Sequence, residues 1–265
     1  MSNCYSPNAG GGCTTGSANS RTASNPFAGV WQVTVDARRT SDSETAPYTL
    51  AATILGASVS PNPDLIPAAS LGVPTARSYT LTNLFGSFTG RAAGTALGSA
   101  NRIVPTIANG AQQQYPLVVL PGATLLRAAI NNTSDPGADL DLYVYNCTTG
   151  TCVLAGQNAD GDSDETVTIN NPAAGNWLVV VLGFAVPSGS TTYRYLDVFS
   201  HPGFGTVSVT DANALRPAGA SWTVPAAVTA TMAPAAGRVL LGNVLVLTDT
   251  NITVGSGEVV IETVN

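Results

Sequence analysis

The sequence predicts an all-β protein built from jelly-roll or β-sandwich modules, with almost no helix. Glycine and proline are abundant, with 27 and 17 of 265 residues, and they divide the chain into short segments. Every segment with a clear hydrophobic pattern has the period of two that marks a half-buried strand, and none has the helical period of 3.6. The segments recur at roughly the 8–12-residue spacing typical of sandwiches and barrels.

The N-terminal region is predicted to be a partial β-domain over residues 1–60. Residues 1–26 are polar and aperiodic and read as a loop, whereas residues 31–35 and 48–55 alternate as strands do. The segment Asn25–Val33 returns, 146 residues later, as Asn171–Val179. Because strand-like sequence precedes only the second copy, we expect the first unit to lack its leading strands.

A proline-rich stretch follows, and we interpret residues 61–75 as a linker because they show no periodicity. The prolines that punctuate it are Pro61, Pro63, Pro67 and Pro74.

The middle of the chain, residues 76–203, is predicted to be one jelly roll. Its clearest strands are residues 115–120, 124–130, 140–145, 165–169, 177–184 and 193–199. Residues 204–265 alternate in the same way and predict a C-terminal sandwich-like unit. The strand-like residues 78–92 fit two placements: they open the middle domain, or the wider segment 76–110 pairs with the C-terminal unit.

Composition excludes several partners. Sixteen acidic residues outnumber ten basic ones, and a net charge of -6 argues against binding nucleic acid. No run approaches the roughly 18–20 apolar residues of a transmembrane helix, so no transmembrane segment is predicted. The first residues lack the basic flank and apolar run of a signal peptide, and we expect any secretion signal to lie upstream.

The four cysteines form two close pairs, Cys4 with Cys13 and Cys147 with Cys152. Neither pair has the histidine or CxxC spacing of a zinc site. We expect two short disulfides and hence an oxidising compartment. The alternative, four free buried thiols, fits less well with their polar neighbours.

No catalytic residue is expected in this chain. Its one histidine, His201, lies in a Ser-His-Pro-Gly turn, where an exposed loop role is the ordinary interpretation. A G-x-S-x-G elbow, a P-loop, a dinucleotide fingerprint and a paired-histidine metal motif are all absent from the sequence. Hydrolysis by a carboxylate pair is compatible with sixteen acids, but no pair stands out. Trp177 and Trp222 begin alternating segments, which favours core packing over a carbohydrate platform.

Acidic residues gather between positions 135 and 165, which hold seven of the sixteen. Asp139 and Asp141 alternate with leucines, so both carboxylates leave one face of a strand. Residues 158–165 are predicted to form a loop with an acid at every second position from Asp160 to Asp164. This pattern suits a hard cation such as calcium, although Ser163 stands where an EF-hand requires glycine. The predicted ligands are Asp139, Asp141, Asp160, Asp162 and Asp164. The alternative is a solvated acidic turn.

Several of these segments resemble the bacterial pre-peptidase C-terminal domain, a jelly-roll-like module found behind the catalytic domains of secreted proteases. The resemblance lies in residues 119–126, 134–145, 165–167 and 171–177. Residues 186–193 and 222–246 are similar to the C-terminal part of large secreted subtilisin-like serine peptidases of actinobacterial type. The peptidase domain and its three catalytic motifs are not in this chain.

The resemblance implies a non-catalytic C-terminal accessory region of a secreted subtilisin-like peptidase, which stabilises the enzyme, attaches it or binds polymeric substrate. Related collagen-binding modules of bacterial collagenases use calcium. The implied partners are an upstream peptidase domain and an extracellular protein or polysaccharide polymer, and the implied location is extracellular. The alternative is a fibre or surface-layer subunit that neighbouring copies of itself complete by strand addition.

Overall fold

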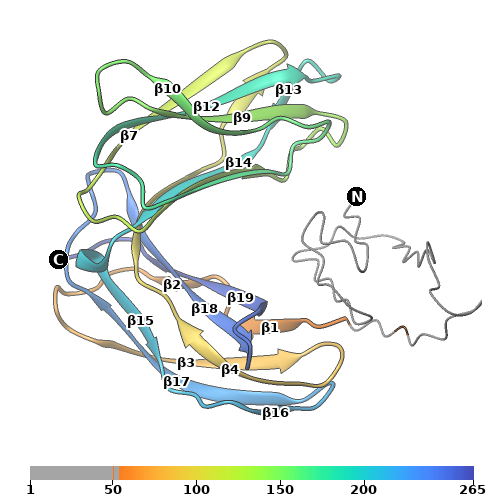
Figure 1. Ribbon diagram of the computed structural model, residues 1–265, viewed down its shortest axis with the longest axis vertical. Coiled ribbons are helices and arrows are strands. Elements are labelled where there is room, and N and C mark those ends of the chain that lie inside the picture. The colour runs from red at the N-terminus through yellow and green to blue at the C-terminus, as the bar shows by residue number, and fades with distance from the viewer. Residues whose placement is uncertain (1–49, 51–53) are drawn as a thin grey trace, which may run out of the picture. The chain divides into compact units, whose positions relative to one another are not determined.

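A computed structural model describes residue 50 and residues 54–265 (Figure 1). These residues form nineteen strands and one three-residue 3-10 helix, η1 (Pro202–Phe204), which confirms the all-β prediction. The strand expected over residues 31–35, most of the strand expected over 48–55, and the Cys4/Cys13 pair lie outside the described residues. Residues 54 and 55, at the end of the second expected strand, are not in a strand, and β1 begins at Ala57.

The first sandwich is formed by the middle of the chain. One layer is a four-stranded antiparallel sheet in the order β10-β9-β12-β7, and the other is the β11-β8-β14-β5 half of a larger sheet (Figure 1). Its strands are β5 (Gly98–Ile103), β7 (Gln112–Val119), β8 (Leu125–Asn131), β9 (Asp139–Asn146), β10 (Val153–Asn158), β11 (Glu165–Asn170), β12 (Gly175–Ala185) and β14 (Arg194–Ser200). The short β6 (Thr106–Ala108) and β13 (Ser190–Thr192) pair with each other beside it.

The second sandwich combines both ends of the described segment. One layer has the order β1-β3-β17-β15, and the other is the β18-β19-β2 half of the larger sheet, with β4 paired to β18 and β16 paired to β4. Its strands are β1 (Ala57–Ser60), β2 (Asp64–Ile66), β3 (Thr75–Asn83), β4 (Phe88–Gly94), β15 (Gly205–Val209), β16 (Ala214–Arg216), β17 (Ser221–Ala230), β18 (Val239–Thr248) and β19 (Thr253–Ile261).

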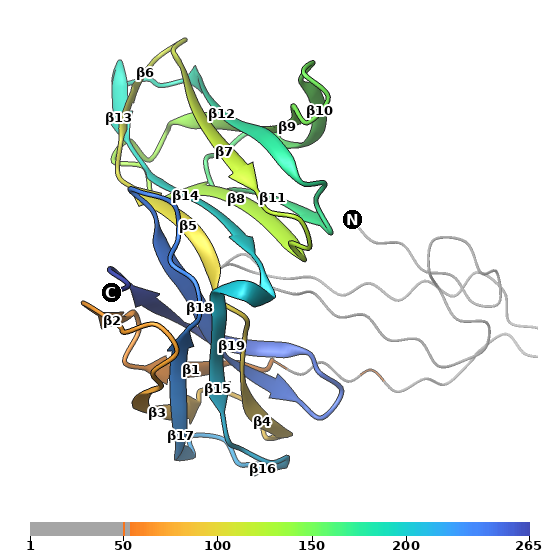
Figure 2. The same cartoon turned by 90° about the vertical axis from the view of Figure 1, so that its left-hand side faces the viewer.

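The chain path inserts the first sandwich into the second. Strands β1–β4 precede the insert and β15–β19 follow it, so we call the second sandwich the host. β3 pairs with β17, and β4 with β18, which places residues from 75–94 against the C-terminal strands. β5 pairs with β14 of the insert and with β18 of the host, so one nine-stranded sheet runs through both (Figure 2).

The proline-rich segment differs from the linker expected there. Within residues 61–75, β2 pairs in parallel with β19. Its first residue, Asp64, is 1% exposed, accepts a hydrogen bond from the Tyr79 hydroxyl at 2.7 Å, and forms an ion pair with Arg77. A buried carboxylate needs such partners, and they come from β3, so this segment packs as part of the host.

The turn before β12 explains one of the sequence motifs. Asn171 and Gly175 both have positive φ values, 48° and 124°, which asparagine and glycine tolerate best. Trp177 then enters the core at 3% exposure, and its indole N–H donates to the Ala173 carbonyl at 2.9 Å. The first copy of the motif, at residues 25–33, lies outside the described residues.

Because Asp64 is buried in its ion pair, we predict that removing its charge lowers the free energy of unfolding more than removing the charge of an exposed ion pair. Asp64→Asn leaves Arg77 without its counter-charge, and we expect the free energy of unfolding to fall by about 2–3 kcal/mol, because removing one partner of a buried pair is costly. The matched control is Glu258→Gln, whose pair with Arg102 is more than a third exposed on both sides and should cost less than about 1 kcal/mol. Urea denaturation of both variants measures the difference, and equal losses would contradict it.

Candidate functional site

Two of the predicted ligands lie at the start of β9. Leu140 and Leu142 are fully buried in the core, so Asp139 and Asp141 leave the opposite face of the strand. Asp141 is nevertheless only 6% exposed, and it accepts a hydrogen bond from the Tyr143 hydroxyl at 2.9 Å. One oxygen of Asp139, Oδ1, is buried without a hydrogen-bond partner. Because both residues belong to β9, the strand fixes the positions from which their carboxylates project.

The loop between β10 and β11 is tied to this part of β9. The Leu140 N–H donates to the Asp162 carbonyl at 3.2 Å and to Ser163 Oγ at 3.1 Å. The Ser163 hydroxyl in turn donates to the Ala138 carbonyl at 2.6 Å, and Ser163 is buried. These contacts bring the loop acids to the β9 carboxylates, although they are about twenty residues apart in sequence.

Three carboxylates converge on this loop. Asp160, Asp162 and Glu165 each offer one oxygen, and these oxygens lie within 4.8 Å of one another. Glu165, the first residue of β11, has no exposed surface. Its Oε1 accepts the Asp160 N–H at 3.3 Å, and its Oε2 is buried with no partner. An unpartnered buried oxygen on a carboxylate is a costly arrangement.

Burial and mutual repulsion shift the titration of this group. Burial, followed by the charges of Asp160, Asp162 and Asp141, raises the pKa of Glu165 to about 7, although the hydrogen bond from the Asp160 N–H works in the opposite direction. The pKa of Asp139 is also raised, first by burial and then by Asp141, Asp160 and Asp162. Carboxylates on β9, the loop and β11 thus act on one another as a single charged group.

The five predicted ligands differ in how they are placed relative to the converging carboxylates. Asp160 and Asp162 belong to the converging group, and Asp139 and Asp141 interact with it electrostatically. Asp164 is exposed and lies outside the group; its backbone N–H donates to Asp162 Oδ1 at 2.8 Å. Glu165 was not among the predicted ligands. Its signal in the sequence is the period of two, because Glu165 shares the buried face of β11 with Val167.

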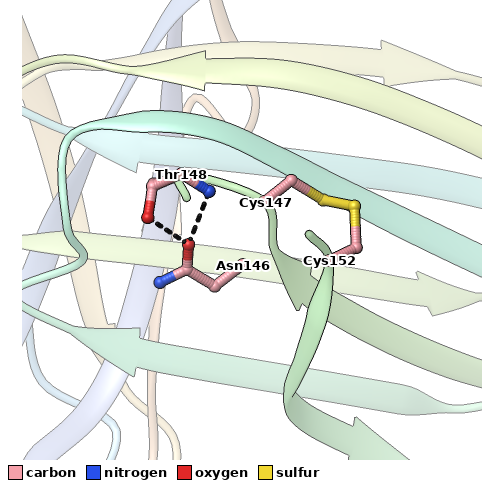
Figure 3. Close-up of a disulfide and its surroundings, with 4 residues drawn as sticks. All are labelled: Asn146, Cys147, Thr148 and Cys152. Atoms are coloured by element: carbon pink, nitrogen blue, oxygen red, sulfur yellow. Dashed lines mark hydrogen bonds between the residues drawn. A yellow bond between two sulfur atoms is a disulfide. The ribbon is translucent and has the colours of Figure 1, made fainter. Parts of the chain in front are cut away.

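A disulfide closes the turn at the other end of β9. Cys147 and Cys152 are bonded, with their Cα atoms 4.0 Å apart (Figure 3). Beside them, Asn146 Oδ1 accepts hydrogen bonds from the Thr148 N–H at 2.9 Å and from the Thr148 hydroxyl at 2.7 Å. The side chain of Asn146 and the disulfide together fix the connection between β9 and β10.

His201 is occupied by structural contacts. Its Nδ1 accepts the Gly203 N–H at 2.9 Å and caps η1. The proton therefore resides on Nε2, which lies 2.9 Å from the Pro121 carbonyl and donates to it. Both ring nitrogens are used in holding the turn between β14 and β15, and neither is placed beside a nucleophile.

Comparison with known proteins agrees with the resemblance noted in the sequence. Residues 117–183 match the family model described as the bacterial pre-peptidase C-terminal domain. These residues are similar to such a domain. The match begins in β7 and ends in β12, so it covers most of the inserted sandwich and contains the acidic residues of β9, the β10–β11 loop and β11.

A curated relative is Pyrolysin from Pyrococcus furiosus, 27% identical over 122 residues. The match covers 45% of this chain, and the chain spans only 8% of Pyrolysin. Among solved structures, a periplasmic inhibitor of g-type lysozyme from Aeromonas hydrophila aligns with TM-score 0.29 and 16% identity, over 39% of this chain and 88% of its own. The Yersinia pseudotuberculosis-derived mitogen aligns with TM-score 0.31 and 15% identity, over 39% and 86%. At these TM-scores the two structures contribute nothing to the functional conclusion.

Within residues 54–265, no helix is long and apolar enough to cross a membrane.

The raised pKa of Glu165 predicts a pH-dependent stability in calcium-free buffer. The folded protein retains a proton up to about pH 7 that the unfolded chain releases near the ordinary value of 4.5. The free energy of unfolding should therefore fall as the pH rises through this window, on the order of 2 kcal/mol, and level off above it. Urea denaturation between pH 4.5 and 8 measures the slope.

Glu165→Gln should flatten this slope, because the amide does not titrate. Asp164→Asn removes an exposed acid from the same loop and should keep it. A slope that is identical in the wild type and Glu165→Gln would show that other groups produce the pH dependence.

Proposed function

We propose that this chain is a non-catalytic C-terminal accessory region of a secreted subtilisin-like serine peptidase. The observation that carries the proposal is the match of residues 117–183 to the pre-peptidase C-terminal domain. The similarity to Pyrolysin over 122 residues supports the same context. The chain is then one part of a longer polypeptide whose peptidase domain lies upstream and whose location is extracellular.

The residues of the described segment support an accessory role rather than a catalytic one. The hydrogen bonds of His201 to Gly203 and Pro121 assign it to a turn. The roles open to such a module are stabilising the enzyme, attaching it to a surface, and binding its polymeric substrate.

The size of the native protein tests the proposal. We expect the intact mass of the protein from its source to exceed 26.8 kDa, the mass of this chain, and its additional sequence to include a peptidase domain. A native protein of 265 residues that polymerises on a size-exclusion column would overturn the proposal and support the structural-subunit alternative.

A deletion separates the possible roles within the peptidase. In the full-length enzyme, removal of residues 54–265 should leave kcat/KM for a short chromogenic peptide within about twofold, because no group of the described segment takes part in the chemistry. A lowered melting temperature of the deleted enzyme indicates stabilisation, and reduced binding to a polymeric substrate indicates attachment. Loss of peptide hydrolysis by a folded deletion variant would contradict an accessory role.

A further inference from the structure

We propose that Asp160, Asp162 and Glu165 bind one calcium ion at the point where the β10–β11 loop meets β9. The carboxylates of the half-buried Asp139 and the buried Asp141 supply further negative charge from β9. The inference concerns the inserted sandwich alone and does not depend on the peptidase context.

The first support is the convergence of ligands. Three carboxylate oxygens within 4.8 Å of one another can contact the same ion, because calcium binds oxygen at about 2.3–2.6 Å and two opposite ligands are then about 5 Å apart. Magnesium requires a near-ideal octahedron at about 2.0–2.1 Å and gives up its bound waters reluctantly. A set of carboxylate ligands supplied by one loop and the strand that follows it therefore suits calcium better.

The second support is that two buried carboxylate oxygens in this region have no hydrogen-bond partner. Glu165 has no exposed surface, yet its Oε2 lacks any hydrogen-bond partner. Oδ1 of Asp139 is also buried and also lacks a hydrogen-bond partner. Buried polar atoms are normally paired, and an unpaired oxygen on a carboxylate that converges with two others requires a positive partner. The salt bridges of the described residues engage Asp64, Asp197, Asp211 and Glu258 rather than this group, so no arginine supplies that charge.

The third support is that the site is prearranged. Ser163 and the Leu140 N–H already hold the loop against β9, and the Asp160 N–H orients the Glu165 carboxylate. Binding then requires little ordering of the loop, which is the main entropic cost of such a site. A bound ion would connect the loop to β11 through Glu165, in addition to the existing contacts with β9.

The experiment is a calcium titration of the 265-residue chain after treatment with a chelator. Isothermal titration should show one site with a dissociation constant below about 1 mM, the range of extracellular modules or tighter. At a calcium concentration ten times the dissociation constant, the melting temperature should rise by about 3–6 °C, because the ion binds only the folded form. Magnesium should bind at least about tenfold more weakly.

A matched pair of variants locates the ion. Glu165→Gln keeps the size of the side chain and removes its charge, and it should weaken calcium binding at least about tenfold. Asp164→Asn removes the same charge from an exposed position beside it and should change the affinity by less than about threefold. Asp160→Asn, also at an exposed position, gives a second ligand variant with little effect on the core, so the test holds even where Glu165→Gln does not fold.

The proposal is overturned if titration with calcium up to 10 mM produces no heat of binding and does not raise the melting temperature of the wild-type chain. It is also overturned if Asp164→Asn weakens binding as much as Glu165→Gln or Asp160→Asn does, because the protein would then attract cations only through its general negative charge.

Discussion

The hydrogen-bonded ladder between β5 and β18 is the interaction on which the architecture depends. It pairs Gly98–Ala100 of the insert with Val239–Leu241 of the host, and so makes one sheet out of two layers that belong to different sandwiches. Arg238, just before β18, reinforces the junction by donating to Ser99 Oγ at 2.7 Å and pairing with Asp197 on β14. A small apolar cluster of Ala100, Val198, Leu241 and Val260 covers the same place. Because backbone and side-chain contacts cross the boundary, the insert is fixed to its host by more than its two connecting segments.

The acidic site depends on a second feature of the sandwich, which is that its two layers meet at the β10–β11 connection. β10 belongs to the layer with β9, and β11 to the layer with β8. The loop between them therefore passes from one layer to the other. Asp139 and Asp141 come from the first layer, Glu165 comes from the second, and the loop acids lie between. Repulsion among these charges acts to separate the layers, whereas a shared cation would hold them together.

Local patterns in the sequence were sufficient for most of the longer strands and for part of the site, although β5 and β10 were not among the predicted strands. The alternation of Asp139 and Asp141 with buried leucines placed both carboxylates correctly on one face, and the Asn-Pro-Ala-Ala-Gly turn predicted the start of β12. The ligand character of Glu165 was missed because its importance comes from burial between layers, and burial depends on which strands pack together. Asp164 was included because a loop shows no periodicity from which the direction of its side chain could be predicted.

The non-local topology could not be derived from local patterns either. The segment with β2 has too few residues to show alternation, and its place is set by a parallel pairing with β19, almost two hundred residues away. The ion pair of Asp64 with Arg77 contributes to that placement, yet neither residue differs locally from an ordinary surface charge. Similarly, residues 78–92 fitted two placements because strand propensity does not specify a partner.

The insertion also determines how the protein transmits mechanical force. The described segment enters through β1 and leaves after β19, and both strands belong to the host. Tension applied between residue 54 and the C-terminal end therefore loads the host ladders first, while the two connections to the insert lie next to each other at the β5, β14 and β18 pairings. The insert stays outside the line of force until the host yields. A pulled molecule would thus extend in two steps, with the acidic site protected during the first.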